Sequence, residues 1–257
     1  MEMVFTFNAS CGSFIGNGRS NNEDNFYFDK KHLPVPNKGL KNPIKCRGTT
    51  DSPIIFAVFD GMGGESKGDE ASCLASEVFT EKVKILDELA LSGKEFMYET
   101  CEKANNAVNE LRIKQQLSSM GTTVAAIYFS QDEVVACNVG DSKIFRIRDN
   151  QMLQISEDHT DEKILTAMGI NKKPVLLQYI GVPDNEMAIE PYISKGDIKS
   201  EDVYLLCSDG VTDILNVEEM YEIICNNSAD DAVRQILSEV NKKDGADNST
   251  VIAIKMI

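Results

Sequence analysis

The sequence predicts an α+β fold built on antiparallel sheets, and the order of its segments is the main reason. Runs rich in Val, Ile and aromatic residues, bounded by Gly, Asp or Asn, predict strands. Two helical patterns separate the first strands from a meander of strands, and a further helical region precedes the last strand. Strands and helices therefore do not alternate as in a parallel βαβ sheet. With 257 residues and 42% hydrophobic content, we expect a single domain over residues 1–257.

The individual elements follow from periodicity and end signals. Residues 67–89 and 95–116 place apolar side chains, such as Phe96, Ala104 and Val108, at helical spacing, and their adjacency predicts an antiparallel pair. In the helical region of residues 216–240, Asn216 and Ser228 each precede an acidic residue by three positions, which is typical of helix starts. The predicted strands are residues 54–59, 122–129, 134–139, 143–148, 203–207 and 249–254.

Composition narrows the classes of function. The net charge of −15 disfavours a nucleic-acid partner, because Lys and Arg supply most of that affinity. No stretch approaches the roughly 20 apolar residues of a membrane span, and the first ten residues do not resemble an export signal, so a cytoplasmic location without membrane contact is expected. Seven cysteines without C-x-x-C spacing predict reduced thiols. With two histidines available, a catalytic metal would be a hard cation, magnesium or manganese.

Residues 30–50 differ from the rest of the chain. They include six Lys or Arg residues and three prolines, and no acidic residue. This composition predicts a long irregular loop, which is either disordered or a docking surface for an acidic partner. If residues 25–28 and 54–59 pair as a hairpin, the loop would lie at the far end of that hairpin, roughly 17 to 20 Å from its acidic end.

Several carboxylates occur where apolar strands end. Asp60 and Asp209 each follow an apolar run and precede glycine. An ionised carboxylate beside a core is unfavourable unless it is paired or binds a cation. For any one of them, the alternative is that Asp-Gly simply forms a turn. Because several strands end in this way, a shared site is favoured. Carboxylates that bridge two cations about 4 Å apart would activate water there for displacement at phosphorus. The other candidates are Asp141, Asp247 and the Glu23-Asp24 pair.

The sequence resembles the type-2C, PPM-type family of metal-dependent serine/threonine protein phosphatases, in a bacterial style. The motifs that carry the resemblance follow the order of the family across nearly the whole chain. They are residues 19–24 (Arg-Ser-Asn-Asn-Glu-Asp), 56–64 (Phe-Ala-Val-Phe-Asp-Gly-Met-Gly-Gly), 121–123 (Gly-Thr-Thr), 138–142 (Asn-Val-Gly-Asp-Ser), 158–160 (Asp-His-Thr), 205–213 (Leu-Leu-Cys-Ser-Asp-Gly-Val-Thr-Asp) and 247–250 (Asp-Asn-Ser-Thr).

The resemblance implies an antiparallel β-sandwich flanked by pairs of antiparallel helices, with metals at one end of the sheets. It also implies hydrolysis of phosphoserine and phosphothreonine in signalling, and a cognate serine/threonine kinase; we expect a monomer. Carried over by position, the family's residue roles give Asp60 as the bridge between two Mn²⁺ or Mg²⁺ ions. Asp209 and Asp247 would hold the first ion, and the Gly61 carbonyl, with Glu23 through a water, the second. Asp24 would support them, Asp141 with Asp209 would take a possible third ion, and Arg19 would bind the substrate phosphate.

Some positions depart from the family pattern. Met62 stands where many eukaryotic members have a histidine that could act as general acid, so a water on a metal or His159 would protonate the leaving group. A lone histidine is more often structural. Residues 161–191 correspond to a variable flap, and Gln178-Tyr179-Ile180-Gly181 differs from the Arg-Ala-Leu-Gly of bacterial relatives. A non-catalytic binding domain and a carboxylate-metal nuclease are the alternatives, which the intact carboxylates and the acidic surface respectively disfavour.

Overall fold

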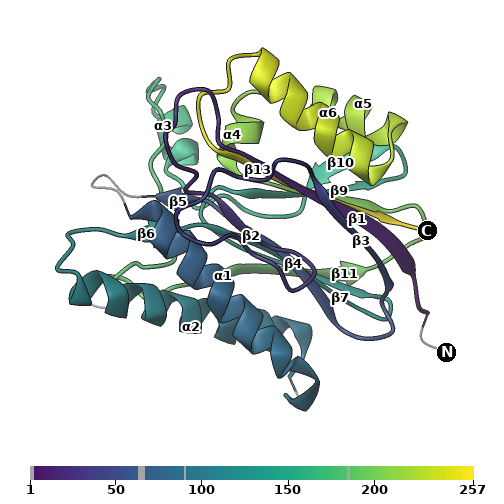
Figure 1. The fold of residues 1–257 in the computed structure, drawn as a ribbon, viewed down its shortest axis with the longest axis horizontal. Coiled ribbons are helices and arrows are strands. Elements are labelled where there is room, and N and C mark those ends of the chain that lie inside the picture. Colours follow the sequence, from purple (N-terminus) through teal and green to yellow (C-terminus); the bar gives the residue numbers. More distant parts are fainter. Residues whose placement is uncertain (1–2, 63–66, 90, 184–185) are drawn as a thin grey trace.

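The computed structural model describes residues 3–62, 67–89, 91–183 and 186–257. Two antiparallel sheets pack face to face, and helices cover both outer faces, which gives four layers (Figure 1). The core between the sheets is dominated by aromatic and β-branched side chains, among them Phe7, Phe56 and Tyr204. This architecture confirms the predicted α+β fold with a sandwich of antiparallel sheets.

The six-stranded sheet has the order β10-β9-β12-β13-β1-β3, and the five-stranded sheet has the order β11-β8-β7-β4-β2. Strands β5 (Gly61–Met62) and β6 (Gly121–Thr122) form a short separate ladder. The first sheet consists of β1 (Thr6–Phe14), β3 (Ile44–Thr49), β9 (Lys143–Arg148), β10 (Gln151–Gln154), β12 (Val203–Cys207) and β13 (Ser249–Met256). The second consists of β2 (Asn25–Tyr27), β4 (Ile54–Phe59), β7 (Val124–Ser130), β8 (Glu133–Val139) and β11 (Tyr192–Asp197).

The helices form one pair on each side of the sandwich. Helices α1 (Gly68–Lys84) and α2 (Gly93–Lys114) pack on the five-stranded sheet, with a 3₁₀ turn (Leu86–Glu88) between them. Helices α4 (Asp209–Thr212), α5 (Val217–Asn226) and α6 (Ala229–Lys242) cover the six-stranded sheet, and α3 (Glu162–Ala167) belongs to the flap. Asn216 and Ser228 accept hydrogen bonds from the backbone three residues on, as the sequence predicts. None of the helices in the described ranges is both long and apolar enough to cross a membrane.

Strand β1 has no counterpart in the sequence prediction. Its buried side chains include small or polar ones, such as Ser10 and Ser13. A Cβ on Gly12 would lie 2.6 Å from Leu237 and 2.7 Å from Val233, so α6 packs too closely on β1 to permit a larger residue there. Close packing of a helix therefore removes the alternation of large apolar residues that would indicate a strand.

The prediction of an irregular loop over residues 30–50 is wrong for its second half. Residues 44–49 form β3, which pairs with β1 at the edge of the six-stranded sheet. The expected placement at the far end is also wrong, because the segment turns back towards the acidic end. There the Asn22 N–H donates to Asn37 O at 3.1 Å, and the Leu40 N–H donates to Ser13 O at 2.8 Å. Deletion of residues 31–47 would remove an edge strand as well as a loop.

Strand register brings the acidic ends of several strands together. Asn25 lies opposite Phe59 in the β2–β4 pair, so that Glu23 and Asp24 adjoin Asp60, as the hairpin hypothesis requires. Cys207 of β12 lies opposite Val251 of β13, and Asp209 opens α4 two residues later. In Figure 1 this end of the sandwich, near β5, β6 and α3, is opposite to the labelled chain ends.

Candidate metal centre

Asp60 and Asp209 occupy the middle of the acidic end. Their carboxyl groups share a hydrogen bond, and burial followed by the charge of Asp209 raises the pKa of Asp60 well above its ordinary value. Burial also raises the pKa of Asp209, whereas the hydrogen bond from Asp60 lowers it. Further charges from Asp24 and Asp141 act on Asp60. The fold therefore holds these carboxyl groups together although their negative charges repel one another.

The backbone positions Asp60 through its neighbours in β6 and β7. Its N–H donates to Thr123 Oγ1 at 3.0 Å, and its carbonyl accepts from the Thr123 N–H at 2.8 Å and from Thr122 Oγ1 at 2.9 Å. The next residue, Gly61, donates its N–H to Glu23 O at 3.2 Å. A Cβ on Gly61 would lie 2.2 Å from Gly68 O, so the close approach of α1 requires glycine here.

Asp24 is fully buried beside this cluster, with 1% of its surface exposed. Its Oδ2 accepts a hydrogen bond from Ser208 Oγ at 2.8 Å, whereas its buried Oδ1 has no hydrogen-bond partner among the described residues. Burial, partly offset by hydrogen bonds from Thr250 and Ser208, raises the pKa of Asp24 to about 7. A buried oxygen without a donor is expected where a proton, water or cation belongs.

Asp141 lies in a turn that His159 supports. Gly140 has a φ of +100° and donates its N–H to His159 Nδ1 at 3.1 Å. Burial and the charge of Asp209 raise the pKa of Asp141 to about 6. Because Nδ1 of His159 accepts a hydrogen bond and burial lowers the pKa of the ring, this histidine is neutral and structural in the present arrangement.

Asn248 fastens the two chain segments that carry Glu23 and Asp247. Its Oδ1 accepts from the Glu23 N–H at 2.7 Å, and its Nδ2 donates to Ile15 O at 2.6 Å and to Asn21 O at 3.1 Å. The sequence analysis includes Asn248 in a motif but gives it no role. Burial raises the pKa of the Glu23 carboxyl, which is half-buried and exposed towards the cavity described next.

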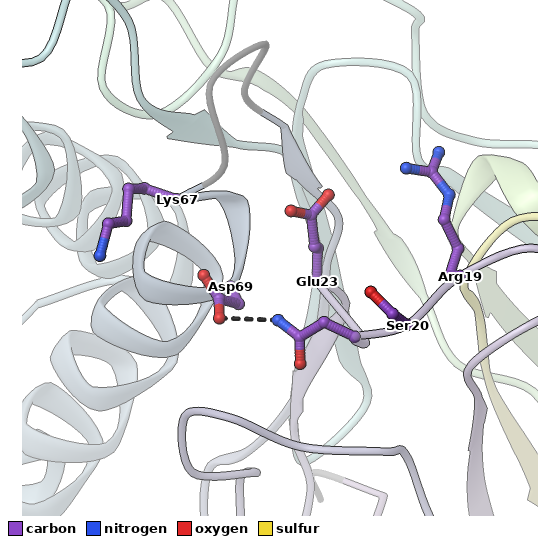
Figure 2. Close-up of a pocket in the computed structure, with 6 residues that line it drawn as sticks. Arg19, Ser20, Glu23, Lys67 and Asp69 are labelled. Atoms are coloured by element: carbon purple, nitrogen blue, oxygen red, sulfur yellow. Dashed lines mark hydrogen bonds between the residues drawn. The ribbon is translucent and has the colours of Figure 1, made fainter.

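Arg19 and Glu23 open into a cavity of about 330 Å³. Figure 2 shows Glu23 between Arg19 and the start of α1, where Lys67 and Asp69 lie. Asn21 Nδ2 donates to Asp69 Oδ2 at 2.7 Å and links the two walls. Lys67 and Asp69 are not among the predicted site residues, because their position in a predicted helix does not indicate which cavity they line.

Asp247 does not lie free beside Asp209 but is paired with Arg19. Arg19 Nη2 lies 2.8 Å from Asp247 Oδ2, with 47% of the arginine and 42% of the aspartate side chain exposed. The hydrogen bond to Asp247 raises the pKa of Arg19, so the guanidinium is firmly cationic. In the described ranges, no three His, Cys, Asp or Glu side chains stand close enough to form a ready-made metal site.

The flap contributes a cation to the acidic end. Lys173 Nζ lies 3.5 Å from Asp213 Oδ2, and the charges of Asp209 and Asp213 raise the pKa of Lys173. The flap is anchored by hydrogen bonds in both directions between Ile180 and Thr122, at 2.8 and 3.0 Å. Lys173 is a further residue that the sequence analysis missed.

The donor set nevertheless fits divalent cations. All of the converging side chains offer carboxylate oxygens, which hard cations such as Mg²⁺ and Mn²⁺ prefer. Burial, followed by the charges of neighbouring carboxylates, raises the pKa values of Asp60 and Asp141, and among the described residues Asp24 Oδ1 has no hydrogen-bond donor. A cation would relieve both of these unfavourable features.

Known proteins resemble this chain in sequence and in fold. The family model described as protein phosphatase 2C matches residues 44–247. The serine/threonine phosphatase stp of Listeria innocua serovar 6a is 30% identical over 220 residues, covering 80% of this chain and 85% of the relative. Among solved structures, the PPM Ser-Thr phosphatase MsPP from Mycobacterium smegmatis in complex with cacodylate is 26% identical, with a TM-score of 0.74 and coverage of 96% and 97%.

The catalytic domain of the serine/threonine protein phosphatase PstP, solved in complex with two manganese ions, has the same fold. The TM-score is 0.78 at 24% identity, over 98% of this chain and 99% of the other. Fold and sequence together define a metal-dependent serine/threonine protein phosphatase. The chain belongs to the protein phosphatase 2C family.

Proposed function

We propose that the acidic end of the sandwich is the catalytic centre, with two divalent cations held by the carboxylates named above. Asp60 would help to hold both cations, Asp209 and Asp247 would hold one, and the Gly61 carbonyl, with Glu23 through a water, would hold the other. When bound, such cations supply Lewis acidity towards phosphate oxygens and lower the pKa of water. The observation that carries the proposal is the meeting of acidic strand ends, where register places Asp24 beside Asp60 and Ser208, next to Asp209, donates to Asp24 Oδ2 at 2.8 Å.

In this proposal the chain's own residues bind and orient the phosphoprotein. The Arg19 guanidinium, beside the cavity, would pair with two oxygens of the substrate phosphate, for which its fork of donors is suited. Asp24, held by Ser208, would keep the neighbouring carboxylates in place through its buried contacts. His159 holds the Gly140–Asp141 turn and transfers no proton.

The identity of the ions is part of the proposal. Manganese and magnesium both suit an all-oxygen donor set, and the PstP structure contains manganese. Asp141, whose pKa is raised by burial and by Asp209, would take a third and weaker ion together with Asp209. We expect an Asp141→Asn variant to require more Mn²⁺ for half-maximal turnover while keeping most of its activity at saturating Mn²⁺.

We propose the same kinase partner, cytoplasmic location and monomeric state that the sequence predicts. A serine/threonine kinase must supply phosphoprotein substrates to an enzyme of this class. The seven cysteines are free, which suits a reducing compartment such as the cytoplasm. We propose that the enzyme acts there as a monomer, which size-exclusion chromatography with light scattering would test.

Hydrolysis of a phosphothreonine peptide with added Mn²⁺ or Mg²⁺ tests the catalytic proposal. Asp60→Asn and Asp209→Asn should each lower kcat/KM at least about a thousandfold, since each removes several kcal/mol of charge stabilisation. The matched control is Asp149→Asn, an exposed aspartate in the β9–β10 turn, which should retain full activity. Turnover that survives in the Asp60 variant, or that needs no divalent cation, would contradict the proposal.

A further inference from the structure

Strand β3 ends the six-stranded sheet and presents an open edge. In the order of described strands, β1 is its neighbour on one side and none follows on the other. Exposed and half-buried residues alternate along it, with Lys45, Arg47 and Thr49 exposed. A sheet edge of this kind offers backbone donors and acceptors to another extended chain.

The hydrogen-bond pattern identifies which backbone groups face outwards. Thr50 donates its N–H to Phe5 O at 2.9 Å, and on the other side of β1 the Ile257 N–H donates to Thr6 O at 2.8 Å. Gly48 lies opposite Phe7, and Cys46 lies opposite Ala9. Both residues therefore direct their backbone N–H and C=O groups at β1. By alternation, Lys45, Arg47 and Thr49 direct their N–H and C=O groups to the open edge.

The same residues carry the positive charge of the edge. Lys45 has 72% of its side chain exposed, and its Nζ lies 4.0 Å from Asp230, which also receives Arg234 at 3.2 Å. Arg47 is exposed opposite Asn8. Asp230 is thus balanced by two cations. Near Cys46, the exposed side chains of Asp29 and Lys31 are paired at 3.8 Å.

We propose that β3 is a docking edge for an extended acidic segment of a protein partner, which adds to the sheet as a further strand. Residues of that segment opposite Lys45 and Arg47 would lie two positions apart, with their side chains beside these cations. The residue between them would face the half-buried Cys46 at the border of the sandwich core, where an apolar side chain fits. The expected motif is therefore acidic, apolar, acidic.

Charge complementarity selects this occupant over a second copy of the chain. Two β3 edges pairing with each other would bring the Lys45 and Arg47 side chains of both copies together, which is unfavourable. Residues 30–50 contain no acidic residue, although the chain as a whole has 41 Asp and Glu residues. The edge is therefore a basic strip on an acidic protein, and it does not depend on the metal centre.

Fluorescence anisotropy with a synthetic peptide tests the proposal on the Mn²⁺-loaded enzyme. The probe is a labelled, end-capped Gly-Val-Glu-Val-Glu-Val-Gly peptide, compared with a version in which both Glu nitrogens are methylated and a version with Lys in place of Glu. We expect saturable binding of the first peptide and at least about tenfold weaker binding of the other two. The first peptide should leave hydrolysis of p-nitrophenyl phosphate by the enzyme unchanged. Such a result would exclude binding of the peptide at the proposed metal centre.

Two enzyme variants separate backbone pairing from charge. Thr49→Pro removes an outward N–H without changing the charge and leaves the ladder to β1, and the double variant Lys45→Glu, Arg47→Glu reverses the charge. Each should weaken binding at least about tenfold, whereas Lys103→Glu on the exposed face of α2 should not. Circular dichroism checks the fold of the proline variant. Equal binding of the methylated peptide or of the charge-reversed enzyme, or no binding at all, would show that the charges only protect the edge.

Discussion

Arg19 donates a hydrogen bond to Asp247 at 2.8 Å, although 228 positions separate the two residues in the sequence. The arginine proposed to bind substrate phosphate thus neutralises a proposed cation ligand. A phosphate dianion near Arg19 and a cation near Asp247 would each compete with this ion pair. Phosphate and cation should therefore help each other to bind, because each releases the partner that the other needs.

Replacement of Arg19 should affect the two ligands in opposite directions. In Arg19→Ala we expect kcat/KM for a phosphopeptide to fall about 10- to 100-fold, the value of a charge-assisted hydrogen bond. The affinity for Mn²⁺, measured by calorimetry without substrate, should rise because Asp247 is released. Arg112→Ala, on α2, serves as the control. Weaker Mn²⁺ binding in Arg19→Ala would contradict the proposed competition.

His159 should prove dispensable for proton transfer. An Asn at position 159 can offer an oxygen to the Gly140 N–H in place of Nδ1, so His159→Asn should keep kcat within about tenfold of the wild type. The alkaline limb of its pH–rate profile, where a general acid loses its proton, should be unchanged. His159→Ala should lose about 1 to 2 kcal/mol of stability. Loss of that limb in His159→Asn alone would instead identify the histidine as the acid.

Asp24 should make the metal-free protein less stable at higher pH. Its pKa is about 7 in the folded chain, against the ordinary 3.8. Between these values the folded state binds more protons than the unfolded state, so the free energy of unfolding falls as pH rises from about 4 to 7, by a few kcal/mol at most. Urea unfolding in chelator at several pH values should show a shallower decline for Asp24→Asn.

The control for that experiment is Asp149→Asn, which should follow the wild-type decline. Added Mn²⁺ should increase the free energy of unfolding of the wild-type protein most at the upper end of the pH range, because ionised carboxylates bind cations. A slope in Asp24→Asn identical to that of the wild type would show that other carboxyl groups carry the effect.

Asn248 should matter for stability and activity together. Asn248→Ala removes three hydrogen bonds and leaves the Glu23 N–H without its acceptor, so the free energy of unfolding should fall by about 2 to 4 kcal/mol. Turnover should also fall, since Glu23 and Asp247 lose their common anchor. Thermal unfolding and peptide hydrolysis measure the two effects, with Asn241→Ala on the exposed face of α6 as control. Normal stability in Asn248→Ala would show that water replaces the anchor.

Strands with a clear apolar pattern could be predicted to the residue. The predicted runs 54–59 and 203–207 coincide with the buried strands β4 and β12, and 143–148 coincides with the partly buried β9. In contrast, β1 carries small residues under α6, and β3 has only Ile44 and Cys46 directed at the core. Neither strand has a local apolar pattern, because tertiary packing determines both of them.

The candidate site could be predicted in its composition but not in its pairing. The glycines that follow Asp60 and Asp209 lie where another backbone segment approaches too closely for a side chain. A single sequence shows such glycines. The pairing of Arg19 with Asp247 and the contact of Ser208 with Asp24 join segments about 200 residues apart. No local pattern encodes such contacts, since they depend on the register of β13 between β1 and β12.

Residues 37–40 return to the acidic end and so connect β3, the proposed docking edge, with the cavity beside Arg19 and Glu23. Lys45 is opposite Ser10, and Ser13 is three residues further along β1, about 10 Å away at strand spacing. Ser13 Oγ accepts from Asn22 Nδ2 at 2.9 Å, at the rim that carries Arg19 and Glu23. A partner strand on β3 would therefore hold its own neighbouring phosphoserine at a high effective concentration, so that even weak docking could favour one substrate over many.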